Sequence, residues 1–414
     1  MTHIPSPFES LQASNPEAEI WWDSSPLVFS KFRNRFLKRA SSTEEAALWR
    51  DQLDRFFDPE RPTEGLVRGV TTNPSLIASW IQSAPEEWLP VITDAISRQH
   101  RPSVEMTYRL VYQTAIARAA DAMFPLWSKS EGKHGWVSGQ TDPRIMFDED
   151  AMLEQALGIA RLAPNVMLKI PGTQAGYRVI EELTARGIST NSTLSYTVPQ
   201  FLACIQAVER GLAKAYTSGL DTRRWRSVIT HMIGRFGTMN DLHGEAEARG
   251  LPLAESDVRW AEIAILKRAD ALIRENGYPC KMLLSSLKTD EKAMSGSHLS
   301  MHLEQTAGAN IAYTCKPDFV ADVISSQSRW RDCGPDGIDS AVPDTVMDRL
   351  MQLPSFRQSY EPDGLSPLEF ASTGAFLGTF MEVNQNIRQL IHHIGLQYER
   401  TVNATLAPVI AGAA

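Results

Sequence analysis

Short apolar segments of strand type alternate with amphipathic helical segments along most of this 414-residue chain. Such alternation predicts βαβ units, because two parallel strands need a long crossover that is usually a helix. The expected strands cover residues 19–24, 66–72, 103–106, 165–173, 188–193, 226–232, 280–286 and 309–314. Eight strands favour a closed (β/α)8 TIM barrel over an open sheet, and no glycine-rich dinucleotide fingerprint follows the first strand.

The segments outside the eight units predict additions to this barrel. Residues 1–18 are expected to form a flexible arm, residues 19–396 a single barrel domain, and residues 397–414 a tail. Insertions are expected near residues 25–64, which hold a capping box for an extra helix, and at 328–367, which are rich in Pro, Asp, Gly and Ser. A last helix near residues 380–394 has one apolar face and should pack on the barrel.

Composition excludes several classes of partner. A net charge of −8 argues against binding to nucleic acid or to an anionic membrane surface. There is no apolar run of about 18 residues, and the four cysteines lack C-x-x-C spacing. We therefore predict a cytoplasmic protein without nucleic-acid or membrane partners, and we leave its oligomeric state open, with a homodimer as one alternative.

Residues 165–173, NVMLKIPGT, place Lys169 inside a short apolar run that is typical of a buried strand. Burial disfavours the ammonium form of lysine. Either a carboxylate keeps such a lysine charged, or its pKa falls and the free amine becomes a nucleophile that forms Schiff bases. A lysine at the strand end that extends its ammonium to solvent is the alternative.

Polar side chains follow the other expected strands, where a barrel gathers its active site. They are Asp23, Asn73, Glu105, Asn191, Thr193, Thr230, Ser286 and Lys288, with Arg235 shortly beyond the sixth strand. An amine, two carboxylates and several neutral hydrogen-bonding groups are the set that Schiff-base aldol chemistry requires. A single Asp or Asn at a strand end is more often a helix cap, so the prediction depends on their joint placement.

Three segments resemble the transaldolase family: GVTTNPSLI at 69–77, NVMLKIPGT at 165–173 and GISTNSTLSYTVPQ at 187–200. The resemblance runs from about residue 20 to residue 394 and implies a class I aldolase barrel without metal or other cofactor, in which Lys169 forms the Schiff base. It implies that Asp23 handles the proton of the C4 hydroxyl, and that Glu105 and Thr193 hold the catalytic water. The implied substrate contacts come from Asn73, Asn191, Thr230, Arg235, Ser286 and Lys288, with Arg235 and Ser286 on phosphate-binding positions.

The implied activity is that of a transaldolase of pentose phosphate metabolism, which moves a dihydroxyacetone unit from a ketose phosphate to an aldehyde acceptor. An aldolase that releases dihydroxyacetone and a catalytically weak relative that binds sugar phosphates are the alternatives. This chain departs from the family at the substrate's far end, where Lys288 replaces an arginine and Met232 and Leu287 replace phenylalanines. The family's VEVD also reads VEMT at residues 104–107, so we expect a shifted substrate preference.

Overall fold

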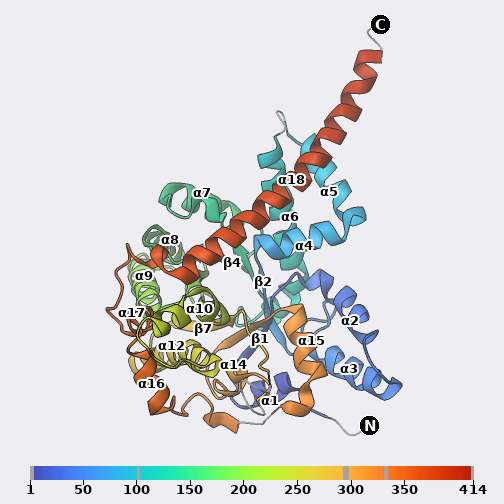
Figure 1. Ribbon diagram of the computed structural model, residues 1–414. Coiled ribbons are helices and arrows are strands. Elements are labelled where there is room, and N and C mark those ends of the chain that lie inside the picture. Colours follow the sequence, from blue (N-terminus) through green and yellow to red (C-terminus); the bar gives the residue numbers. More distant parts are fainter. Residues whose placement is uncertain (1–3, 100–102, 292–297, 331–333, 412–414) are drawn as a thin grey trace.

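The computed structural model describes residues 4–99, 103–291, 298–330 and 334–411. Its centre is a closed barrel of eight parallel strands in sequence order (Figure 1). The strands are β1 Glu19–Trp22, β2 Val67–Thr72, β3 Trp136–Gln140, β4 Val166–Pro171, β5 Thr190–Ser195, β6 Ser227–Met232, β7 Cys280–Ser285 and β8 Ala312–Cys315. Pairing of β1 with β8 closes the barrel, so the predicted (β/α)8 architecture is confirmed.

Helices surround this barrel between the strands (Figure 1). They are α4 Pro74–Ser83, α5 Pro85–Ser97 and α6 Val104–Lys129 before β3, then α7 Glu149–Ala160, α8 Gln174–Ala185, α9 Val198–Thr217, α10 Ile233–Met239, α11 Leu242–Glu247, α12 Glu255–Asn276, α14 Met301–Glu304 and α15 Pro317–Ser325. The two expected insertions are themselves partly helical, with α2 Phe29–Leu37 and α3 Thr43–Phe56 in the first and α16 Asp344–Leu350 and α17 Pro354–Tyr360 in the second.

The third strand is not where the sequence predicted it. Ser103 caps α6 by accepting a hydrogen bond from the backbone N–H of Met106, so residues 103–106 begin a helix. The actual strand, Trp136–Gln140, has two polar residues, Ser138 and Gln140, on its inner face and a glycine, Gly139, packed against helices. Its sequence WVSGQ therefore lacks the apolar run by which buried strands are recognised.

Both chain ends also differ from the prediction. Residues 7–13 form α1 Pro7–Ala13, and its Phe8 and Leu11 are fully buried, so this part of the expected flexible arm is packed on the barrel. The predicted last helix is longer than expected: α18 extends over Gly374–Ala411 and includes most of the predicted tail.

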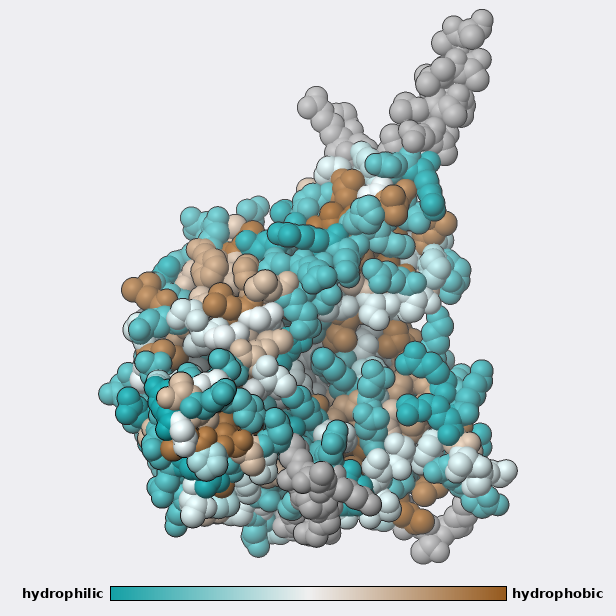
Figure 2. Space-filling model, viewed as in Figure 1, coloured by the Kyte–Doolittle hydropathy of each residue, from teal (hydrophilic) through white to brown (hydrophobic). Residues whose placement is uncertain are grey.

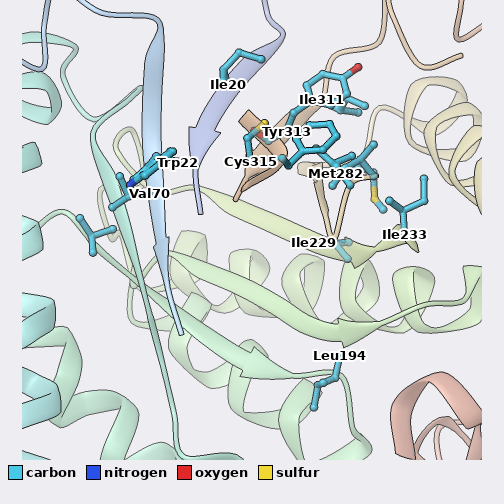
Figure 3. Close-up of a cluster of buried hydrophobic side chains, with 14 of the residues drawn as sticks. Ile20, Trp22, Val70, Leu194, Ile229, Ile233, Met282, Ile311, Tyr313 and Cys315 are labelled. Carbon is cyan, nitrogen blue, oxygen red and sulfur yellow. The ribbon is translucent and has the colours of Figure 1, made fainter. Parts of the chain in front are cut away.

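The strands alternate between two hydrophobic environments. Side chains on their outer faces pack against the helices, and Figure 3 shows Tyr313 of β8 beside Met282 of β7 in this layer. A second cluster fills the barrel interior and consists mainly of Trp21, Trp136, Met167, Val228, Leu283 and Ala312. Gly69 makes room for it, because a Cβ there would lie 2.6 Å from the Trp21 indole.

Below this cluster, at the start of the strands, a layer of buried charges surrounds Glu19, which is 3% exposed. Arg226 approaches its carboxylate to 2.5 Å and Lys281 to 2.7 Å. Burial would raise the pKa of Glu19, but Arg226, His134 and Lys281 hold it well below its usual range. The lower half of the barrel, at the amino ends of the strands, is thus filled with side chains. The polar groups at the carboxyl ends of the strands lie in the upper half.

The helix α18 lies across the elements that follow β2, β5 and β6 (Figure 1). It is fixed there by two hydrogen bonds, from Tyr196 to Thr379 at 2.7 Å and from Asn386 to Ser75 at 2.9 Å. Its Phe376, Ile387, Leu390 and Ile394 are buried, so the predicted packing of the last helix on the barrel is confirmed.

The surface in Figure 2 is mostly hydrophilic, and its hydrophobic side chains form separate small patches. Across the described ranges, every helix is too short or too polar to span a lipid bilayer.

Candidate active site

Lys169 points into the barrel from the middle of β4. Its neighbours Leu168 and Ile170 belong to the outer hydrophobic layer, and Met167, two residues away, belongs to the interior cluster. The side chain is 5% exposed. Burial, together with the positive charges of Lys316 and Arg235, lowers the pKa of Lys169 to about 8, although the negative charge of Asp23 acts to raise it. Among the described residues no ion pair holds this amine, so part of it is uncharged near neutral pH.

The Asp23 carboxylate is buried directly after β1 and belongs to the same interior. The Thr71 hydroxyl donates to it at 2.5 Å and lies 2.7 Å from the Thr314 hydroxyl. Since Thr71 has one proton, Thr314 donates to Thr71 and a chain of two hydroxyls orients the carboxylate. Asp23 therefore has a fixed position within electrostatic reach of Lys169.

Asn191 lies opposite Lys169 in the pairing of β4 with β5. Its amide N–H donates to Ser138 of β3 at 2.8 Å, and its carbonyl oxygen accepts from Thr230 of β6 at 2.6 Å. All three side chains are fully buried. The structure thus brings the predicted Asn191 and Thr230 together as a rigid bridge across the barrel interior beside the lysine.

Asn73 directly follows β2, as predicted, whereas Thr193 lies inside β5, two residues before its end. Thr193 is 2% exposed and lies opposite Pro171, where the ladder of β5 and β6 is irregular. Asn73 caps α4, since its side-chain oxygen accepts from the backbone N–H of Leu76 at 3.0 Å. Its amide N–H groups are the ones that can still donate to a substrate.

Glu105 does not lie at a strand end, contrary to the prediction. It is in the first turn of α6, its side chain is 43% exposed, and it pairs with Arg144, which also binds Asp142. The residue opposite Lys169 in the pairing of β3 with β4 is Gln140. Gln140 is 4% exposed and lies on the same strand face as Ser138, so its neutral amide is the group that faces the lysine.

Arg235, in the first turn of α10, is held by the last helix. Its two terminal nitrogens each lie 2.7 Å from a carboxylate oxygen of Glu382 on α18, and one lies 3.4 Å from Thr379. The Arg235 side chain is 14% exposed. Burial opposes its charge, but the hydrogen-bonded Glu382 outweighs this effect and raises the pKa of the guanidinium.

Ser286 and Lys288 follow β7, and they diverge. Ser286 has φ 58°, and its carbonyl lies so close to Gly234 that a Cβ there would be 2.3 Å from it. Lys288 instead lines a cavity between α10 and α12, together with Arg259 and Glu262. Lys288 and Arg235 thus extend toward α12 and α18, and a phosphate site shared by the two side chains stays a prediction.

Sequence reasoning missed Gln140, Lys316 and Glu382. Lys316 follows β8 directly in extended backbone, two residues after the inward-facing Thr314, so it continues the inner face beside Asp23. Its position at the end of a strand could have been recognised from the sequence, because Lys316 precedes the proline that opens α15. Glu382 had no such signal, because only the folded chain brings α18 to Arg235.

Comparison with known proteins identifies a family whose profile this chain matches. The profile of the transaldolase/fructose-6-phosphate aldolase family matches residues 48–353. A transaldolase of Thiobacillus denitrificans is 32% identical over 219 residues, which cover 51% of this chain and 58% of that protein. Transaldolase 2 of Streptomyces avermitilis is 33% identical over 231 residues, 53% of this chain and 59% of that protein. A transaldolase of Mycobacterium ulcerans is 30% identical over 223 residues, which cover 51% of this chain and 59% of that protein. The alignments thus span less than two thirds of these relatives.

Proposed function

Because the chain belongs to the transaldolase/fructose-6-phosphate aldolase family, we propose that it transfers a dihydroxyacetone unit from a ketose phosphate to an aldehyde acceptor. The observation that carries this proposal is the buried Lys169 amine, whose pKa of about 8 leaves it partly uncharged, with the Asp23 carboxylate beside it. The resemblance adds the cytoplasm and pentose phosphate metabolism as the proposed setting.

The reaction begins with attack of the neutral Lys169 amine on the C2 carbonyl of the donor. Loss of water gives an iminium, which accepts the electron pair of the C3–C4 bond when that bond breaks. Asp23 takes the proton of the C4 hydroxyl as it becomes the carbonyl of the first aldehyde product. The three-carbon enamine then remains on Lys169.

The second half reverses these steps with another aldehyde. The enamine carbon attacks the acceptor carbonyl, and the new alkoxide takes the proton that Asp23 holds. Water then hydrolyses the iminium and frees the lysine. In this scheme Asn191, Thr230 and Asn73 are hydrogen-bonding groups for the hydroxyls of the three-carbon unit, and Thr193 contacts the water.

Borohydride reduction in the presence of fructose 6-phosphate tests the first step. We expect the mass of a reduced three-carbon unit on the peptide that contains Lys169, and no such mass in Lys169→Met. Lys267 is an internal control, because burial also lowers its pKa to about 8 while its ammonium binds the carbonyl oxygens of Gly337 and Ile338. An adduct on Lys267, or none with any ketose phosphate that the enzyme consumes, would contradict the proposal.

Product analysis separates transfer from release. With a ketose phosphate and a second aldehyde, we expect a new ketose that contains the donor's first three carbons. Accumulation of free dihydroxyacetone at the same rate with and without acceptor would instead indicate an aldolase.

A further inference from the structure

We propose that Glu382 is a specificity-determining residue that competes with a substrate phosphate group for Arg235, and that Lys316 is the second cation of this anion subsite. The inference rests on the proposed function, since it concerns the charged end of the sugar that Lys169 binds. It names two residues, on α18 and after β8, to which the sequence analysis assigned no role.

Glu382 and Arg235 form a bidentate ion pair. Glu382 receives one hydrogen bond from each terminal nitrogen of Arg235, both at 2.7 Å. This parallel arrangement is the one that a guanidinium uses for carboxylates and phosphates alike. The Glu382 carboxylate therefore occupies the face of Arg235 that a phosphate would need.

The Glu382 side chain can leave Arg235 without movement of its helix. The Glu382 side chain is 46% exposed, so it has a path to water. The backbone of α18 is fixed on both sides of it, by the bond of Thr379 to Tyr196 and the bond of Asn386 to Ser75. Thr379 also lies 3.4 Å from Arg235 and would stay in place when a phosphate arrives.

The second cation of the subsite is Lys316. Lys316 lies at the same end of the barrel as Asp23, because the backbone N–H of Asp23 bonds to the carbonyl of Cys315 at 2.9 Å. Its charge acts on both Lys169 and Glu382, so Lys316 lies within electrostatic reach of the Schiff-base lysine and of the ion pair. Lys288, by contrast, lies with Glu262 between α10 and α12.

This arrangement makes phosphate binding an exchange of anions. A phosphorylated sugar must displace Glu382 from Arg235 before it binds there, whereas an uncharged polyol leaves the ion pair intact. Glu382 therefore reduces the preference for phosphorylated over unphosphorylated substrates. Its removal should increase that preference.

Titration of the protein with inorganic phosphate tests the subsite directly, and the KM values for a phosphorylated and an unphosphorylated aldehyde acceptor test it in turnover. We expect Glu382→Gln to lower the Kd for phosphate by about three- to tenfold, within the range for hydrogen bonds to a charged group. The KM of the phosphorylated acceptor should fall by the same factor, and that of the unphosphorylated acceptor should not change. Lys316→Gln should raise the Kd for phosphate by a similar factor.

Two further variants keep the test decisive. Glu399→Gln removes an exposed carboxylate of the same helix and should leave the phosphate Kd unchanged. Glu382→Asp keeps the charge but shortens the side chain, so it should fall between the wild type and Glu382→Gln.

The inference is overturned if Glu382→Gln leaves the phosphate Kd unchanged, or changes both KM values equally. It is also overturned if Lys288→Gln, and not Lys316→Gln, weakens phosphate binding. Because the titration measures binding of phosphate alone, its result stands apart from the Schiff-base test at Lys169.

Discussion

Replacing Lys169 by methionine is expected to stabilise the folded protein while it removes the Schiff base. Methionine has a similar length and fits the buried position between Met167 and the strand end without a charge. The folded state lowers the lysine pKa from 10.5 to about 8, and this difference corresponds to roughly 3 kcal/mol that opposes folding. We expect Lys169→Met to gain up to about that amount at pH 7.

The pH dependence gives this prediction its specific signature. Between pH 8 and 10.5 the unfolded chain holds the lysine proton more often than the folded chain, so the wild type gains stability as pH rises. The penalty from Lys169 is therefore fully present below about pH 8, falls to about 1 kcal/mol near pH 9.5, and vanishes above about pH 10.5. Other groups titrate in both proteins and cancel in the difference.

Urea unfolding of wild type and Lys169→Met at pH 7, 8.5 and 9.5 measures this difference. The exposed Lys129→Met is the matched control, and its free energy of unfolding should stay within about 0.5 kcal/mol of wild type at each pH. The reasoning is refuted if Lys169→Met is less stable than wild type at pH 7, or if its advantage does not shrink as pH rises.

Three other changes test the site and the barrel. Asp23→Ala should slow turnover by about 10² or more, the scale for a positioned general base, while borohydride still traps the donor on Lys169; wild-type turnover would show that another group is the base. Gln140→Glu places a carboxylate opposite Lys169 and should raise its pKa, so the midpoint of imine formation against pH should move above 8, and an unmoved midpoint would show that the two side chains do not interact. Glu19→Gln leaves Arg226 and Lys281 without their buried partner and should lower the free energy of unfolding by about 3 kcal/mol or more in a urea titration, whereas a change under 1 kcal/mol would mean that water reaches this layer.

The sequence predicted the barrel well because most of its strands combine apolar residues with polar residues at or near their carboxyl ends. Lys169, Asp23, Asn191 and Thr230 were found by that rule, and all four side chains are buried at the strand ends or in the upper barrel interior. The rule failed for the third strand, whose inner face carries Ser138 and Gln140 and whose burial comes from its neighbours.

The error at the third strand led directly to the error at Glu105. Once residues 103–106 were read as a strand, their glutamate took the place beside the lysine that Gln140 occupies. The pairing of Arg235 with Glu382 could not be predicted for a different reason. The two residues are 147 positions apart, and no local pattern records a contact over that separation.

That separation also fixes the order in which the site is completed during synthesis. At about 5–20 residues per second, the ribosome needs roughly 7–30 s after Arg235 to reach Glu382. Through this interval the nascent chain carries the arginine without its carboxylate, and α4, α5 and α10 lack the helix that covers them. The nascent protein therefore passes through a stage in which the charge of Arg235 is not neutralised by Glu382 and apolar surface is accessible to chaperones. Docking of α18 neutralises the charge and covers the apolar surface in one step.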